Sequence, residues 1–271
     1  MNFAYIVPRI IRHFMPEKLA DWMKKKKVII KAGIETSNPQ AAATRYLDSF
    51  SKEGISLNGK IVIIFGYGGN ITTACELLKM GAARIILCER EDLPFPVFDE
   101  SFLKNYPDYF ISDEKGIQIK SAHIQIFHKD IRALAEDPGA EKMDLVISSS
   151  VFEHLDDPDS ITGALYKLTK SGGVHFHFVD LRDHYFKYPF EMLTFSPSTW
   201  KNWLNPTSNL NRFRIQDYRA VFEKYFSSID INIIESDLQA FNRVKERILK
   251  GFLSGNTSTD SATMISIKAK V

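Results

Sequence analysis

The chain has 271 residues, of which 44% are hydrophobic, and carries a formal net charge of +2 with a pI near 8.3. This length can bury the core of one large α/β domain with an extension, and the near-neutral charge argues against a dedicated nucleic-acid-binding protein. Two cysteines, Cys75 and Cys88, lie in apolar runs and match neither a disulfide framework nor a metal-ligand spacing. They favour buried thiols in a reducing, cytoplasmic protein.

Residues 1–58 are expected to form a helical N-terminal cap. Apolar side chains recur at helical spacing from Phe3 to Phe14, and a lysine run follows at 24–27. Two interpretations remain open: a helix packed on its own domain, which we favour, or an amphipathic helix that contacts a membrane surface. Pro8 and Arg9 interrupt the apolar core that a signal peptide would need, and no run approaches 18 uninterrupted apolar residues, so no transmembrane helix is predicted.

From residue 59 onward, predicted strands and helices alternate. Strands are expected at 60–65, 84–88, 123–128, 144–148 and 174–179, and helices at 72–80, 132–136, 160–169 and 215–225. Residues 90–122 look long and irregular, and the chain finishes with two strand-like runs at 228–236 and 262–271. This order predicts a doubly wound, Rossmann-like α/β sheet, mostly parallel, with an antiparallel C-terminal strand.

The first predicted strand breaks into the glycine-rich stretch FGYGGN at residues 65–70. Gly66, Gly68 and Gly69 have no Cβ, so the backbone can approach a ligand closely, and the following helix directs its amide groups to the same place. Glu89 closes the second strand 23 positions after Gly66, near the spacing of about 20 residues that places an acid on ribose hydroxyls in nucleotide-binding folds. The unit therefore predicts an adenosine-containing cofactor.

A nicotinamide-dependent oxidoreductase is the first alternative. The third glycine of a dinucleotide fingerprint would fall at Ile71, whose bulk would crowd a pyrophosphate. Tyr166 and Lys170 have the spacing of the catalytic pair of short-chain dehydrogenases, but the stretch SGG at 171–173 is expected to end their helix at once. We interpret this segment as a solvated helix end, which weakens the alternative.

The stretches IVIIFGYGGNITTACELLKMGAARIILCE and DLVISSSVFEHLDDPDSITGALYKLTKSGGVHFHFVD, together with the terminal strand pair, resemble class I S-adenosylmethionine-dependent methyltransferases. The resemblance covers residues 59–180 in motif order and 215–271 by topology. It implies cofactor contacts from the glycine turn and the following strand ends: Gly66, Tyr67, Gly68, Gly69, Glu89, Asp130, Ile131, Ser148 and Ser149. Among these, Glu89 would hold the ribose hydroxyls, Asp130 the adenine amine, and the two serines would lie near the sulfonium.

The sequence departs from the family pattern at two positions, Ile64 and Asn70, where an acid and a third glycine are common. A non-catalytic, methyltransferase-like partner protein therefore remains a second alternative. The pair Glu153-His154 also resembles part of a metal site of some quinone O-methyltransferases, but its first acid is Ser150 here, so no metal is predicted.

The acceptor side is expected at the ends of the fourth and fifth strands. His184 is the preferred candidate for a base, oriented by Asp180 or Asp183, and His154 is the competing candidate. His175 and His177 alternate along a strand, which favours structural roles. Residues 180–214 form an aromatic insert, interpreted as an acceptor-pocket wall or, alternatively, as a small core. Residues 59–271 would form the methyltransferase domain, acting on the oxygen or nitrogen of a small molecule.

Overall fold

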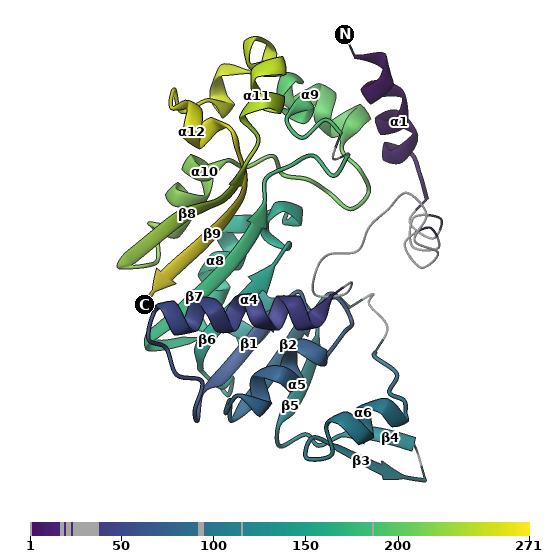
Figure 1. Ribbon diagram of the computed structural model, residues 1–271, viewed down its shortest axis with the longest axis vertical. Helices are drawn as coiled ribbons and strands as arrows, with labels where there is room; N and C mark the ends of the chain where they lie inside the picture. The colour runs from purple at the N-terminus through teal and green to yellow at the C-terminus, as the bar shows by residue number, and fades with distance from the viewer. Residues whose placement is uncertain are drawn as a thin grey trace.

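A seven-stranded sheet forms the centre of the computed structural model (Figure 1), which describes residues 2–16, 19, 23, 38–91, 95–114, 116–185 and 187–271. The strand order is β5-β2-β1-β6-β7-β9-β8, and a separate hairpin pairs β3 with β4. The strands are β1 Ile61–Phe65, β2 Arg84–Glu89, β3 Phe110–Asp113, β4 Gly116–Ile119, β5 Ile124–His128, β6 Met143–Ser149, β7 Thr169–Asp180, β8 Ser228–Ser236 and β9 Ala262–Lys270.

The first five strands of the sheet, β5 to β7, run parallel, whereas β9 lies antiparallel between β7 and β8. This confirms the predicted sheet, including its reversed C-terminal strand. The α-helices are α1 Phe3–His13, α4 Pro39–Lys52, α5 Thr72–Lys79, α6 Glu100–Asn105, α7 Ile131–Ala135, α8 Pro158–Lys167, α9 Pro197–Thr199, α10 Ile215–Phe222, α11 Leu238–Val244 and α12 Thr257–Asp260. Shorter helical turns are η1 Phe152–His154, η2 Glu191–Thr194, η3 Trp200–Leu204, η4 Lys245–Arg247 and η5 Lys250–Phe252.

Helices cover both faces of the sheet because its central strands are apolar on both sides. In Figure 1, α4 and α5 cross in front of the strands, and their buried Tyr46 and Leu78 pack on Ile64 of β1 in one core cluster. The opposite face packs against α7, α8 and α10, with Leu165 and Phe222 fully buried. This two-sided burial is typical of parallel α/β sheets.

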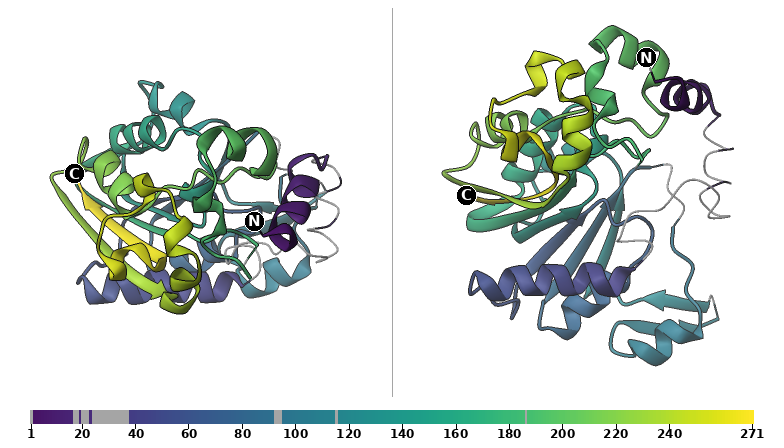
Figure 2. Two further views of the ribbon diagram at one scale, coloured as in Figure 1. Left: turned by 90° about the horizontal axis from the view of Figure 1, so that it is seen from above. Right: turned by 45° about the horizontal axis from the view of Figure 1, so that its top comes forward.

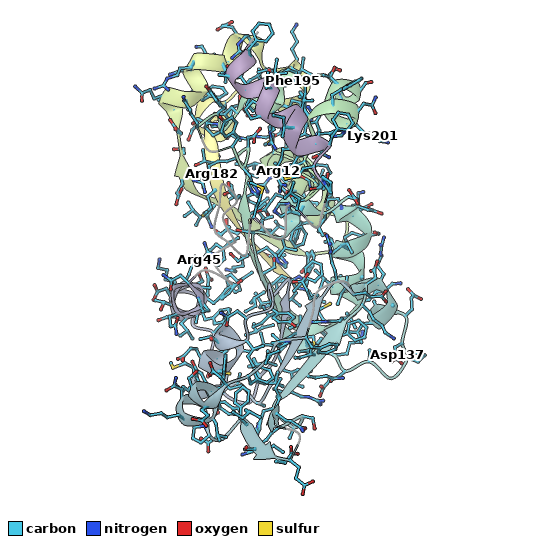
Figure 3. All side chains as sticks on the ribbon, turned by 90° about the vertical axis from the view of Figure 1, so that its right-hand side faces the viewer. Arg12, Arg45, Asp137, Arg182, Phe195 and Lys201 are labelled. Atoms are coloured by element: carbon cyan, nitrogen blue, oxygen red, sulfur yellow. The ribbon has the colours of Figure 1, made fainter. Side chains whose placement is uncertain are left out.

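A third apolar core joins the N-terminal helix to the insert. Tyr5 and Ile6 of α1 pack with Phe190 and Trp200 of the insert and with Phe241 of α11. Figure 2 shows α1 lying beside the helices of the insert, away from the sheet, and Figure 3 places the labelled Phe195 and Lys201 next to it. The chain thus adds a second, smaller body of packed aromatics above the carboxyl end of β7.

α1 is also anchored by a buried polar contact. The Arg9 guanidinium and the Tyr5 hydroxyl both bond to the carboxylate of Asp183, which is fully buried. The lysine run at 24–27 lies outside the described residues. None of the described helices is long and apolar enough to cross a membrane.

Two local expectations differ from the structure. Residues 90–122, expected to be irregular, contain α6 and the β3–β4 hairpin, whose four-residue strands are too short to show an alternating pattern. Lys170 does not end a helix: α8 ends at Lys167, and Lys170 lies in β7 with its Nζ 2.8 Å from Asp144. The cause is the Leu168 carbonyl, which accepts a bond from Met143 N and so draws the chain back to the sheet.

Candidate functional site

The glycine turn follows β1 at the carboxyl edge of the sheet. Gly66, Gly68 and Gly69 have φ angles of +78°, +64° and +79°, a region that favours glycine. A Cβ on Gly66 would lie 2.2 Å from Cγ2 of Val151, so the turn is packed directly against the loop that follows β6. At Gly66 the absence of a Cβ is therefore required by packing against Val151, and the expected close approach to a ligand stays a prediction.

Glu89 ends β2 beside this turn. Its Oε2 accepts a hydrogen bond from Gly68 N at 3.0 Å, and its Oε1 accepts one from Arg90 N at 3.1 Å. A pocket of about 290 Å³ opens next to the turn, lined by Gly68, Gly69, Asn70, Ile71, Pro96, Val97, Phe98 and Phe102. The sequence spacing thus brings the acid and the glycine backbone into contact.

Asn70 stands where methyltransferases commonly have a third glycine, and Ile71 where a dinucleotide fingerprint has one. Both side chains stabilise the fold here. Asn70 Oδ1 accepts a bond from Thr72 N at 3.0 Å and so closes the start of α5. Ile71 is 1% exposed and belongs to the core below α5. A buried isoleucine at this place leaves no room for the close helix approach of a dinucleotide site.

Tyr67, predicted as a cofactor contact, lies beside the turn with two residues that were not predicted from sequence, His128 and Phe95. The Tyr67 hydroxyl lies 2.5 Å from His128 Nε2, and the exposed ring of Phe95 stacks on His128 at 4.3 Å. Burial and the neighbouring Glu89 raise the pKa of Tyr67, which keeps its phenol protonated. The three residues are far apart in sequence and match no motif, so only the fold brings them together.

Asp130 and Ile131 follow β5 as the resemblance required, but Asp130 already has partners. Its carboxylate caps α7 through Arg132 N and forms a salt bridge with the Arg132 guanidinium, which lowers its pKa. Ile131 is 1% exposed. An adenine contact would have to share Asp130 with Arg132, and it stays a prediction.

Ser148 and Ser149, at the end of β6, point to different surroundings. Ser148 is fully buried, and its Oγ lies 2.8 Å from Nδ1 of His177. Ser149 Oγ bonds to the Arg45 guanidinium from α4. Their predicted place near the sulfonium stays untested. Arg45, which lies in helix α4, was not among the residues predicted from sequence.

His154 and His184, predicted as competing bases, lie together. Their ring centroids are 4.9 Å apart, and both rings are half-buried. Nδ1 of His154 lies 2.9 Å from Ser208 O and 2.7 Å from Asn209 O. Carbonyl oxygens only accept, so Nδ1 carries the hydrogen that it donates to them.

The carboxylates expected to orient His184 have other partners. Asp180 binds the Arg182 guanidinium through both oxygens, and Asp183 binds Tyr5 and Arg9 of α1. The acid that does join the histidine pair is Glu153. Ligand atoms of Glu153, His154 and His184 all lie within 4.8 Å of one another.

Glu153 is 4% exposed, and neither of its carboxylate oxygens has a hydrogen-bond partner among the described residues. Burial, and then the nearby charge of Asp180, raise its pKa well above the ordinary value. A buried acid without donors costs about 1–3 kcal/mol of stability, so this arrangement calls for a partner.

The insert uses its polar residues to hold backbone. Arg212 donates to the carbonyls of Met192 and Phe195, and Arg214 to those of Leu181, Asp260 and Ala262. Asn211 donates from its side chain to Phe152 O and Leu155 O, and its backbone N–H to Glu153 O, which clamps η1. These contacts fix the loop that carries Glu153 and His154.

His175 and His177 of β7 are fully buried, as a structural role requires. His175 contacts Thr169 Oγ1 at 2.8 Å and lies 3.2 Å from His177. Burial lowers the pKa of His175 well below its usual value and that of His177 to about 3, so both rings stay neutral.

Comparisons with known proteins agree with this fold. Residues 109–177 match the family model described as a methyltransferase domain. Ubiquinone biosynthesis O-methyltransferases from two strains of Pseudomonas putida are 30% identical over 121 residues, which is 45% of this chain and 44% of each relative. Over these residues the chain is similar to class I S-adenosylmethionine-dependent methyltransferases.

Solved methyltransferases share the fold at low identity. Phosphoethanolamine N-methyltransferase 2 of Haemonchus contortus, in complex with phosphomonomethylethanolamine and S-adenosylhomocysteine, has a TM-score of 0.52 at 13% identity over 97% of this chain and 59% of its own. The same enzyme with S-adenosyl-L-methionine gives 0.50 at 14% identity, over 84% and 52%. The chain thus spans less than half of the curated methyltransferases it matches and little more than half of these two structures.

The family model matches only part of the predicted site, because it covers residues 109–177. They include Asp130, Ser148 and His154, but neither the glycine turn at 66–69 nor His184. The geometry of the turn and of the histidine pair therefore comes from the structure.

Proposed function

We propose that the chain is an active S-adenosylmethionine-dependent methyltransferase that modifies oxygen or nitrogen of a small molecule. The observation that carries this proposal is the 3.0 Å hydrogen bond between Gly68 N and Glu89, which joins a glycine turn and a strand-end acid at one edge of the sheet. The similarity to methyltransferases supports the same chemistry. The curated relatives are named as O-methyltransferases, which favours a hydroxyl acceptor.

The residues present fit this cofactor. Positive φ angles at Gly66, Gly68 and Gly69 keep the turn free of side chains, and Glu89 is half-buried, with a carboxylate that can exchange its amide partners for ribose hydroxyls. When bound, the cofactor supplies a methyl group already activated by its sulfonium. The protein's task is then to align the acceptor and to take up its proton.

The histidine pair is the proposed place of that proton transfer. His154 follows β6, His184 follows β7, and parallel strands end at one edge of the sheet, so both lie on the cofactor side. Because Nδ1 of His154 donates to two carbonyl oxygens, Nε2 is the nitrogen that would take up the proton of the acceptor. Aromatic residues of the insert pack beside α1. We also propose that residues 1–58 act as a lid over the cofactor and that residues 180–214 form a wall of the acceptor pocket.

Titration calorimetry tests the cofactor directly. We expect S-adenosylmethionine and S-adenosylhomocysteine to bind one equivalent each, and NAD⁺ and NADH not to bind. Tight binding of NADH would overturn the assignment in favour of an oxidoreductase. If none of the ligands bound, the chain would be a non-catalytic relative.

A further inference from the structure

We propose that Glu153, His154 and His184 form a binding site for one divalent first-row transition-metal ion, such as Zn²⁺, Co²⁺ or Fe²⁺. Among the described residues, these three form the group of potential ligands whose atoms lie within 4.8 Å of one another. Two imidazoles and one carboxylate are a donor set that such ions accept, with positions left open for water or substrate.

The first argument is the state of Glu153. It is 4% exposed, both of its oxygens lack partners among the described residues, and it lies next to two imidazoles. A charge of two on an ion between these groups would compensate a buried carboxylate that the surrounding protein leaves without donors. The Arg182 guanidinium donates to both carboxylate oxygens of Asp180.

The second argument is the orientation of His154. Its Nδ1 donates to Ser208 O at 2.9 Å and Asn209 O at 2.7 Å, so Nε2 is the nitrogen that would coordinate the ion. Metal-binding histidines usually donate their other N–H to a carbonyl or carboxylate in this way. Asn209 also donates its side-chain amide to His154 O at 3.1 Å, which fixes the backbone of the same residue.

The third argument is size. An ion about 2.1 Å from each ligand sets the ligand atoms about 3–4 Å apart, so small side-chain rotations from the present positions complete the site. Both histidines are half-buried, which gives the ion and an acceptor access from solvent.

His184 was predicted from sequence as a base and not as a metal ligand. The motif around Glu153-His154 lacks its first acid, and two ligands alone make a poor site, so no metal was expected. The third ligand comes from the end of β7, 30 residues along the chain, and only the sheet register brings it near. The ion's part in methyl transfer rests on the proposed function and refines it. His154 and His184 would serve as ligands, and the cation would favour deprotonation of an acceptor hydroxyl in place of direct proton transfer to an imidazole.

The test uses the whole chain, freed of metal with a chelator, and Co²⁺ as the probe. Calorimetry and the visible absorption of Co²⁺ should show one equivalent bound through nitrogen and oxygen ligands. Mg²⁺, which prefers oxygen ligands, should bind far more weakly. Loss of a hydrogen-bond partner of a metal ligand typically lowers metal affinity by about 10–100-fold. Loss of a ligand itself costs more, so His184→Ala and Glu153→Gln should each weaken Co²⁺ binding by at least about 100-fold.

His13→Ala is the matched control. His13 is also half-buried, and its Nδ1 lies 2.6 Å from a carbonyl of the insert, Asn205 O, yet it is outside the ligand group. This variant should bind Co²⁺ like the native chain. Unchanged binding by His184→Ala or Glu153→Gln, with far-ultraviolet circular dichroism showing folded protein, would overturn the site.

Titration of S-adenosylhomocysteine into the same samples separates the two proposals. If S-adenosylhomocysteine binds and Co²⁺ does not, the metal site is wrong and the methyltransferase proposal stands. If one Co²⁺ binds through these residues and S-adenosylhomocysteine does not, the metal site stands and the proposed function fails.

Discussion

At the β1–β2 half of the carboxyl edge, Glu89 accepts hydrogen bonds from two backbone amides, whereas at the β6–β7 half Glu153 is buried without a partner among the described residues. The first acid is satisfied within the fold and can exchange its donors for those of a ligand. The second carries an unfavourable desolvation of about 1–3 kcal/mol. In the proposed function, the β1–β2 half binds the cofactor and is called the cofactor half, and the β6–β7 half binds the acceptor and is called the acceptor half. Cofactor binding would then exchange existing hydrogen bonds of Glu89, whereas the acceptor half contains an acid without a partner among the described residues.

The largest expected effect is on turnover at the acceptor half. His184→Ala should lower the rate by roughly 10²–10⁴-fold, because it removes one of the two imidazoles at the proposed place of proton transfer. The measurement is release of S-adenosylhomocysteine with a panel of small hydroxyl and amine acceptors. His123→Ala, at a half-buried histidine before β5, is the control and should retain full activity. Full activity in His184→Ala would place the acceptor elsewhere.

The next effect concerns the cofactor half. Glu89→Ala should weaken S-adenosylhomocysteine binding by about tenfold or more, since charge-assisted hydrogen bonds contribute about 1.5–3 kcal/mol each. Calorimetry measures the change, and Glu91→Ala, an exposed acid two residues later, is the matched control. An affinity that Glu89→Ala leaves unaltered would mean that this carboxylate stays on the turn and does not meet the ribose.

A smaller effect is expected on the free energy of unfolding at acidic pH, because the histidines of β7 are buried and neutral. Burial lowers the pKa of His177 from 6.5 to about 3, so between these values the unfolded chain binds a proton that the native chain does not. Stability from this group is therefore complete above pH 6.5 and is lost as the pH falls toward 3, by up to about 1.4 kcal/mol per pH unit.

Urea unfolding at pH 7, 6, 5 and 4 measures this loss. His177→Gln should flatten the curve, whereas His123→Gln should leave its slope unchanged. Parallel curves for native chain and His177→Gln would contradict a neutral, buried imidazole at this position.

The smallest effect separates the two serines at the end of β6. Ser148→Ala removes a partner of His177 and should lower stability by about 1 kcal/mol while changing cofactor affinity less than about twofold. Ser149→Ala, which loses its bond to Arg45, is the comparison. A large loss of cofactor affinity in Ser148→Ala alone would restore the predicted contact with the cofactor.

The sheet and the cofactor half were accessible from sequence because their signals are local. An apolar strand, a glycine turn and an acid 23 positions later lie within one βαβ unit, and parallel pairing of β1 with β2 places them side by side. The reversed β9 followed from the order of the last elements. Asp130, Ser148 and Ser149 were found at the strand ends, but their present partners, Arg132, His177 and Arg45, depend on side-chain packing that no spacing encodes.

The acceptor half was harder because its parts are joined by register and by the insert. His184 reaches His154 only because β6 and β7 end together, and Glu153 looked like half of a broken motif. The insert was interpreted as an acceptor-pocket wall or, alternatively, as a small core. Phe190 and Trp200 are 1% and 4% exposed and form a core with α1. Aromatic composition predicts buried surface, but it does not tell on which side that surface lies.

The anchoring of α1 has a practical consequence. Arg9 and Tyr5 bind Asp183, and Tyr185 N donates to the same carboxylate at 2.8 Å, so helix α1 helps to hold the backbone on both sides of His184. A substitution in α1 that breaks this anchor should therefore disturb the position of His184, although α1 itself lies away from the sheet.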